Sequence, residues 1–333
     1  METNQDARLS VAPMMDWTDR HCRYFHRCLS RHTTLYTEMV TAPALVRGQA
    51  VHLLRHDPAE HPVVLQLGGS DPVELAQASA MGWQAGYREI NLNCGCPSDR
   101  VQSGCFGAVL MEQPERVAEI CRAMIAASPA RITVKCRIGV DDQEPERTLP
   151  AFLETVARAG VGHVIIHARK AWLAGLSPKE NREIPPLDHA LVLAMKRAFP
   201  ELRITINGGI TTLAQARAFL DQGLDGVMIG RAAYQRPGDL LLGADAEIFG
   251  AQAQSDRQGA VALMRPYIVR ELARGTRLAA ITRHMLGLFA GHPGARFWRR
   301  VLSEQAHRPG AGLGVLESAL IAMQEAEVAR AGS

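Results

Sequence analysis

The alternation of short apolar segments with longer amphipathic ones constrains the fold of this chain more than any other feature. We expect eight strands, at residues 9–14, 34–39, 63–68, 89–93, 132–137, 163–169, 203–207 and 226–230. Several of them are nearly continuous aliphatic runs, which is typical of strands covered on both faces. Eight strand–helix units over about 225 residues favour an α/β fold of the (β/α)8 TIM-barrel type over an open doubly wound sheet.

The expected helices of this region cover residues 72–86, 114–128, 148–160 and 213–223. Gly86, Gly160 and Gly223 end three of them shortly before a strand, as glycines at helix C-termini do. No G-x-G-x-x-G sequence follows the first strand, which counts against a Rossmann domain.

The strand pattern stops after residue 237, and only helical patterns follow, at residues 258–272, 277–289, 295–303 and 315–329. A chain of 333 residues accommodates one large domain and one small one. We therefore expect a TIM barrel over residues 1–243 and a small all-helical domain over residues 244–333, with the boundary near residues 238–250.

The charge is distributed unevenly. The net charge is +3, but residues 256–308 contain ten arginines, no lysine and three acidic residues, so this segment carries +7 and the remainder −4. Arginine forks onto phosphate and stacks on bases, and the asymmetry favours an anionic polymer as partner. The alternative is a solvated helical face.

The seven cysteines are scattered singly, which favours reduced thiols in the cytoplasm. The first eight residues are polar, without an apolar signal segment, and we find no apolar run of the roughly 18 residues that a membrane span needs. Cys94-x-Cys96 lacks a second pair at zinc-ligand spacing, so no metal site is expected. We expect a monomer with no membrane and no obligate protein partner.

Polar or otherwise special residues end almost every expected strand, where the chemistry of such a barrel collects. These residues are Pro13, Met14, Met15, Glu38, Gln66, Asn91, Asn93, Cys96, Lys135, Arg137, His167, Arg169, Asn207, Gly208, Gly209, Gly230 and Arg231. The glycines after the last two strands leave bare backbone amides that a phosphate can approach, and Arg231 could add a charged contact. An ordinary pair of tight turns is the alternative.

Lys135, His167 and Gln66 are expected to point into the mouth above that phosphate. A lysine inside a strand is costly to bury without an anionic partner, and a reduced flavin ring offers one. Gln66 suits the pyrimidine edge of a flavin, although a satisfied core amide fits it equally, and His167 could be structural. Cys96 lies beyond the fourth strand, before a glycine-containing loop, where a thiol suits a general acid that closes on its substrate.

Three motifs give the chain a family resemblance. They are APMMDWTD at residues 12–19, NLNCGCPS at residues 91–98 and HARKAWLAGLSPKENR at residues 167–182. With these motifs the chain resembles the dihydrouridine synthases over nearly its whole length, and the third motif resembles the A subfamily. Cys94 departs from the apolar residue that relatives often carry there.

The resemblance implies an FMN-binding barrel and a helical tRNA-binding domain. It implies that FMN is held by Pro13, Met14, Met15, Gln66, Lys135, His167, Asn207, Gly208, Gly209, Gly230 and Arg231. It implies Cys96 as proton donor, with Asn93, Arg169, Lys179 and Arg182 near the RNA. The expected reaction is reduction of uridine 20 or 20a in the D-loop of tRNA, in the elbow region, with NADPH as reductant.

Two other functions are compatible with parts of this pattern. A small-molecule flavin oxidoreductase of the dihydropyrimidine or dihydroorotate type can use a similar barrel and acid. It would leave the arginine-rich helices and the loop at residues 170–186 without a role. A non-catalytic RNA-binding protein would not need Cys96, Lys135 and the phosphate turns together.

Overall fold

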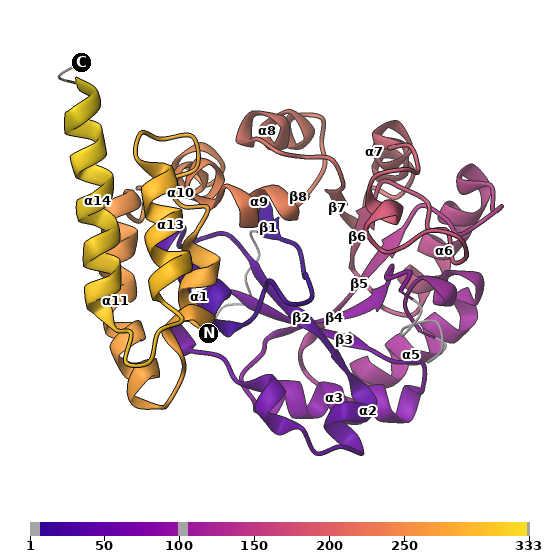
Figure 1. Ribbon diagram of the computed structural model, residues 1–333. Helices are drawn as coiled ribbons and strands as arrows, with labels where there is room; N and C mark the ends of the chain where they lie inside the picture. The colour runs from indigo at the N-terminus through magenta and orange to yellow at the C-terminus, as the bar shows by residue number, and fades with distance from the viewer. Residues whose placement is uncertain (1–6, 99–105, 332–333) are drawn as a thin grey trace.

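Eight parallel strands form a barrel in the computed structural model, which describes residues 7–98 and 106–331 (Figure 1). The strands are β1 Leu9–Val11, β2 Leu35–Thr41, β3 Val63–Gly68, β4 Glu89–Cys94, β5 Arg131–Arg137, β6 His163–His167, β7 Arg203–Asn207 and β8 Gly226–Ile229. Their order is β1-β8-β7-β6-β5-β4-β3-β2, with every neighbouring pair parallel.

The two ends of this sheet meet between β1 and β2. Ser10 and Thr34 form a parallel bridge, the Val11 amide donates to the Thr34 carbonyl at 2.9 Å, and the Thr34 amide donates to the Leu9 carbonyl at 3.0 Å. The predicted (β/α)8 TIM-barrel fold is therefore confirmed.

Helices alternate with the strands around the barrel. They are α1 Arg20–Leu29, α2 Ala42–Val46, α3 Pro72–Gln84, α5 Pro114–Ala127, α6 Pro145–Arg158, α7 His189–Ala198, α8 Leu213–Asp221 and α9 Arg231–Gln235. Short 3-10 helices supplement them: η1 Val51–Leu54, η2 Pro58–Glu60, η3 Gly107–Glu112 and η4 Glu180–Arg182. Gly86, Gly160 and Gly223 all have positive φ just beyond a helix, which explains why these helices end where the sequence predicted.

The core has two parts, as the alternation of side chains along a strand requires. A small interior cluster contains Ala12, Tyr36, Val64, Ile165 and Met228, one from each of five strands or strand ends. A far larger cluster fills the space between strands and helices and continues into the C-terminal helices.

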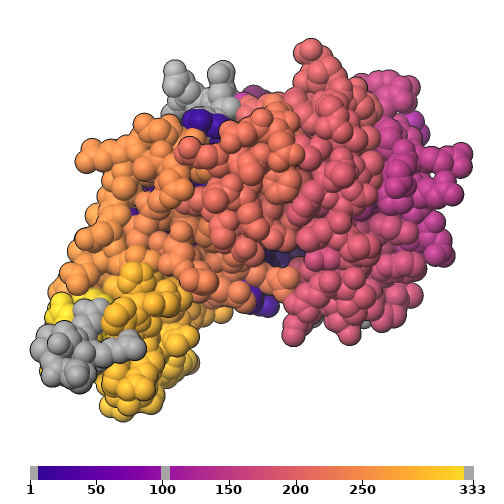
Figure 2. Space-filling model, turned by 90° about the horizontal axis from the view of Figure 1, so that it is seen from above, coloured from indigo at the N-terminus to yellow at the C-terminus, as the bar shows by residue number. Residues whose placement is uncertain are grey.

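After α9 the chain is helical, as expected. Its elements are α10 Pro237–Glu247, α11 Arg257–Ala273, α12 Leu278–Thr282, η5 Arg283–Met285, α13 Ala295–Gln305 and α14 Leu313–Ala331. They form a lobe at one side of the barrel, beside α1 (Figures 1 and 2). Trp298 is fully buried within it, and its indole N–H donates to the Met285 carbonyl at 2.9 Å. Within the described ranges, no helix has the length and apolar character needed to cross a bilayer.

Two element boundaries differ from the sequence-based expectation. Strand β1 ends at Val11 rather than at residue 14, because Pro13 has no N–H to continue the ladder. The helix expected at residues 277–289 is broken into α12, η5 and turns. Gly287 lies in the turns after η5, where a Cβ would lie 2.2 Å from the Gln235 carbonyl oxygen, so the backbone there packs closely against the end of α9.

Candidate active site

A chain of side-chain amides crosses the carboxyl ends of β3 and β4. Gln66 Nε2 donates to Asn91 Oδ1 at 2.8 Å, and Asn93 Nδ2 donates to Gln66 Oε1 at 2.9 Å. Asn91 Nδ2 donates in turn to the Thr133 hydroxyl at 2.9 Å. Each amide fixes the orientation of the next, so the remaining N–H and the remaining lone pair of the Gln66 side chain point in defined directions. This is the arrangement that orients a polar group for a ligand.

Asn93 also shapes the turn that presents Cys96. Its Oδ1 accepts the Gly95 and Cys96 amides, both at 3.0 Å. The Cys96 carbonyl accepts the Ala108 amide at 2.9 Å, so the chain at Ala108 lies beside Cys96. Asn93 is only 9 % exposed, and the structure brings it to Cys96 as a support for the turn.

The two neighbouring thiols lie in different environments. Cys94 is fully buried on β4, and burial raises the pKa of its thiol well above the ordinary value. Cys96 is partly exposed and follows the strand. Only Cys96 is therefore accessible to a substrate at the mouth. Cys22, Cys28, Cys121 and Cys136 are buried as predicted, whereas Cys105 lies outside the described residues.

Positive charge gathers around Cys96. Burial and, to a smaller extent, the nearby Arg137 lower the pKa of Lys135 to about 8. Among the described residues no carboxylate pairs with the Lys135 ammonium group, so this half-buried cation suits an anionic ligand. Burial, with Arg137 and Lys135 nearby, holds the pKa of His167 well below its ordinary value, and His167 is neutral.

Arg137, which was expected at a strand end, and Asn181 organise the loop that follows β6, although neither was predicted to bind cofactor or RNA. Arg137 is 3 % exposed and donates to the carbonyls of Gly95 at 3.1 Å, Lys170 at 3.0 Å and Asn181 at 2.8 Å. Asn181 is fully buried, and its Oδ1 accepts the Trp172 amide at 2.7 Å. Arg137 thereby ties the turn before Cys96 to the residue 170–182 loop.

The turn after β7 requires glycine at two positions. Gly208 has φ of +114° and Gly209 has φ of +74°. A Cβ at Gly208 would lie 2.7 Å from His167 Cδ2, and one at Gly209 would lie 2.5 Å from Leu187 Cδ1. His189 Nε2 lies 2.8 Å from the Gly208 carbonyl oxygen and fixes this peptide. The site thus has room only for bare backbone, as a phosphate-binding turn needs.

The turn after β8 carries Arg231 at its edge. The Arg231 guanidinium pairs at 2.5 Å with Glu183, which belongs to the long loop at residues 170–186, so part of the Arg231 charge is used by this ion pair. Asn207 Nδ2 donates to the Met228 carbonyl at 2.8 Å and joins β7 to β8. A Cβ at Gly230 would have its nearest neighbour at 3.7 Å, so this glycine is not required by packing alone.

The loop after β1 places Pro13, Met14 and Met15 at the mouth. The Met14 amide donates to the Thr18 hydroxyl at 3.0 Å, and Met15 is 55 % exposed. Trp17 stacks on Tyr234 of α9 with ring centroids 4.5 Å apart. This stacking holds the outer side of the loop against α9.

The residues predicted near RNA lie around the same opening. Lys179 and Arg182 are exposed on the long loop. Arg169 donates to the Pro185 carbonyl, while its buried Nε has no partner in the structure. Burial lowers the pKa of Arg169 and that of Arg182, and the nearby Arg231 guanidinium acts on both in the same direction. The cluster is basic and open to solvent.

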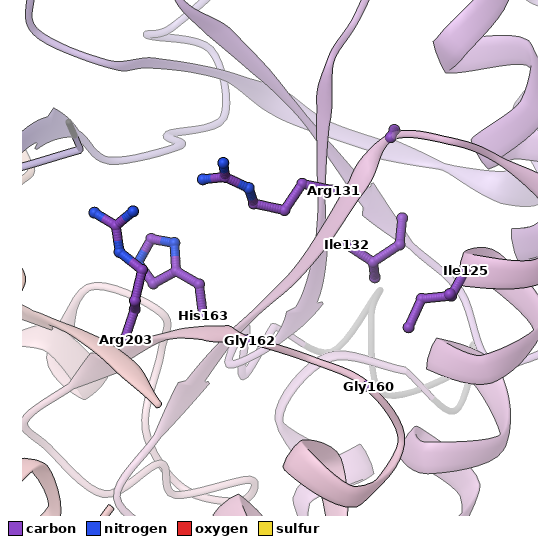
Figure 3. Close-up of a pocket in the computed structure, with 8 residues that line it drawn as sticks. Ile125, Arg131, Ile132, Gly160, Gly162, His163 and Arg203 are labelled. Atoms are coloured by element: carbon purple, nitrogen blue, oxygen red, sulfur yellow. The ribbon is translucent and has the colours of Figure 1, made fainter. Parts of the chain in front are cut away.

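A hollow also lies at the opposite, amino-terminal end of the strands, where Arg131, His163 and Arg203 line it (Figure 3). Each of these is the first residue of its strand. His163 Nε2 lies 2.8 Å from the Thr205 hydroxyl, and burial lowers the pKa of His163 to about 3. Its Nδ1 has no partner and is closed to water, so a ligand in the hollow could not reach it. This end of a barrel serves stability rather than chemistry.

Comparison with known proteins agrees with this geometry. The family described as "Dihydrouridine synthase (Dus)" matches residues 10–326. A protein named tRNA-dihydrouridine(20/20a) synthase from Escherichia coli K12 is 57% identical over 96% of this chain and 92% of its own length. Its namesakes from Vibrio cholerae and Yersinia pestis are 57% and 55% identical over 94% of this chain, and over 95% and 90% of their own lengths. The solved structure of an old yellow enzyme homologue from Zymomonas mobilis has a TM-score of 0.52 at 12% identity, over 69% of this chain and 86% of that one, and supports the fold alone.

Proposed function

The chain belongs to the dihydrouridine synthase family, and from that premise we propose that it reduces uridine to 5,6-dihydrouridine at positions 20 and 20a of the tRNA D-loop. The observation that carries the proposal is the similarity, over nearly the whole chain, to relatives named for that activity. The cofactor we propose is FMN, and the reductant is NADPH. We propose the cytoplasm as the compartment, in keeping with the six free thiols among the described residues.

The residues at the mouth fit FMN on two grounds. The half-buried Lys135 ammonium group has no carboxylate partner among the described residues and would face a negative charge on the ring. The turn at Gly208 and Gly209 leaves no space for side chains and offers backbone to a phosphate. We propose that the cofactor is held by Pro13, Met14, Met15, Gln66, Lys135, His167, Asn207, Gly208, Gly209, Gly230 and Arg231. When bound, FMN supplies the hydride that is added to C6 of uracil.

Cys96 supplies the other half of the reduction. Its thiol holds a proton at Sγ and gives it to C5, so hydride and proton together saturate the C5–C6 double bond. Asn93 fixes the turn that aims Sγ, through the two amides bound to its Oδ1. Lys135, Arg137 and Arg182 would stabilise the thiolate that remains until it is protonated again.

Binding of tRNA is proposed for the basic rim and the C-terminal helices, residues 244–333. Arg169, Lys179 and Arg182 stand at the opening through which the target base would enter. A uridine must leave its stack to reach the mouth, and unstacking requires phosphate contacts that hold the neighbouring backbone. On α13, Arg296 and Arg300 lie over the Phe297 ring at 4.7 and 5.1 Å, a surface suited to phosphate and bases.

The test compares two cysteine variants in two half-reactions. We expect Cys96→Ala to keep FMN and NADPH oxidation but to lose dihydrouridine formation on tRNA by about 10²–10⁴-fold, the usual contribution of a general acid. Cys94→Ala is the matched control and should stay active, because that thiol is buried. Dihydrouridine is measured by mass spectrometry of nucleosides from unmodified tRNA transcripts. Equal losses in both half-reactions would give Cys96 a structural role.

The rival small-molecule activity is tested in the same assay. Replacing tRNA with free uracil or orotate should give no reduction above background if the arginine-rich helices are needed for substrate binding. Turnover of a free pyrimidine with no activity on tRNA would refute the proposed function. A purified protein that is colourless and gains no flavin when mixed with FMN would also refute it.

A further inference from the structure

Strand β2 contains a bulge at the barrel mouth. Tyr36 is paired with Val64 and Met39 with Gln66, so Thr37 and Glu38 together face a single residue of β3. The Thr37 hydroxyl accepts the Gln66 amide at 3.0 Å and donates to the Glu38 carbonyl at 2.7 Å, and so stabilises the irregularity. Bulges beside active sites commonly change the direction of one side chain. Here that side chain is Glu38.

Glu38 reaches the loop after β1. Its Oε1 accepts the Asp16 amide at 2.5 Å. Asp16 is the third residue of a turn that closes with the Trp17 amide donating to the Met14 carbonyl at 3.1 Å. Its φ is +64°, in the left-handed region where glycine is usual at this turn position. A non-glycine residue keeps such a conformation only where its surroundings hold it.

Glu38 forms no ion pair with any of the residues that the structure describes. Its acidic neighbours Asp16 and Asp19 raise the pKa of Glu38, after burial, while the Asp16 amide and Arg23 lower it. Arg23 is engaged by Glu60 at 2.6 Å, and Arg283 by Asp19 at 2.6 Å. A half-buried carboxylate among like charges is costly, so what it contributes is its hydrogen bond.

We propose that Glu38 is a positioning residue for the cofactor loop, residues 13–18. By accepting the Asp16 amide it keeps the turn in the shape that presents Met14 and Met15 at the barrel mouth. This inference rests on the proposed function, which assigns the loop to FMN. Glu38 itself need not touch the cofactor.

The test is a double-mutant cycle between Glu38→Ala and Asp16→Gly. Glu38→Ala should raise the Kd for FMN by about 10-fold, the weight of one hydrogen bond to a charged group. It should speed hydrogen exchange of the Asp16 amide by a similar factor. In the Asp16→Gly background the effect on FMN should fall below about 3-fold, because glycine adopts positive φ without support. Glu38→Gln keeps an acceptor oxygen and should restore most of the affinity.

Glu154→Ala, an exposed glutamate on α6, is the matched control and should change neither quantity. Unchanged Asp16 exchange in Glu38→Ala would overturn the proposal. So would an equal loss of FMN affinity in both backgrounds, since Glu38 would then act on the cofactor directly. If the wild-type protein bound no FMN, the proposed function would fail. Hydrogen exchange on the same protein would still decide whether Glu38 holds the turn.

Discussion

Replacing Gly208 tests the phosphate-binding turn, provided that its two physical effects are separated. Its φ of +114° is unfavourable for any residue with a Cβ, which costs about 1–3 kcal/mol. The added carbon would also lie 2.7 Å from His167 Cδ2 and 3.1 Å from Leu187 Cδ2. Overpacking of this kind costs about 1–3 kcal/mol. Gly208→Ala should therefore lower the free energy of unfolding by about 2–6 kcal/mol.

Two other glycines serve as matched controls that separate the conformational cost from the cost of overpacking. Gly223 has φ of +95° but open space around its Cβ position, so Gly223→Ala carries the conformational term alone, about 1–3 kcal/mol. Gly162 has neither a positive φ nor a neighbour within 4 Å, so Gly162→Ala should stay within about 0.5 kcal/mol. Alanine is preferable to valine at Gly208, because the larger side chain would displace His167 further and confuse the two effects.

The measurements are urea denaturation of the FMN-free variants and FMN affinity by fluorescence. We expect the destabilisation to increase from Gly162→Ala to Gly223→Ala to Gly208→Ala, and only Gly208→Ala to lose FMN. Equal destabilisation of the Gly208 and Gly223 variants would refute the predicted contact with His167. A folded Gly208→Ala protein with full FMN affinity would remove this turn from the cofactor site.

Two further predictions concern charge. Replacing Arg296, Arg299 and Arg300 with Gln should weaken tRNA binding without changing FMN affinity, and should flatten the log–log salt dependence by roughly 0.7–0.9 per lost phosphate contact. Weaker binding with an unchanged salt slope would indicate a misfolded helical lobe. In the FMN-free protein the lowered pKa of Lys135, about 8, lies below its value of about 10.4 in the unfolded chain, so between these two pH values the unfolded chain binds more protons. The free energy of unfolding should therefore rise with pH across that window, with the slope expected for a difference of at most one bound proton. Lys135→Met should abolish this dependence in denaturation experiments.

The barrel could be predicted because its signals are local. Aliphatic strands and glycines beyond helix ends repeat at short range, and the strand ends bring the residues after them to one face. Gln66, Lys135 and His167 were predicted in this way to lie at that face. The irregular contacts could not be predicted from local signals, because each of them joins residues that are far apart in sequence. Arg137 donates to the Asn181 carbonyl across 44 residues, and Gly287 packs closely against the backbone of Gln235.

The Glu38 contact illustrates the same limit. The sequence places a glutamate at the end of a strand, and this position alone suggested a residue of the site. Its partner is a main-chain amide 22 residues earlier, which no side-chain pattern reveals. The shift in register that directs it also leaves no mark in the alternation of residues, since β2 is buried or partly buried throughout. Only the pairing with β3 shows it.

Helix α1 couples the mouth of the barrel to the helical lobe. It starts at Asp19, whose carboxylate caps the helix and contacts both Arg283 and His284 of η5. Burial alone would raise the pKa of Asp19, but its hydrogen bonds, first the one with His284, lower that pKa well below the ordinary value, so the Asp19 carboxylate is ionised. The next residue, Arg20, pairs with Glu271 of α11 at 2.7 Å. The cofactor loop and the arginine-rich helices are thus joined by side-chain contacts to one short helix. Phosphates held by the lobe would then fix how far along the RNA the mouth can reach, which would limit the accessible uridines to a few neighbouring positions.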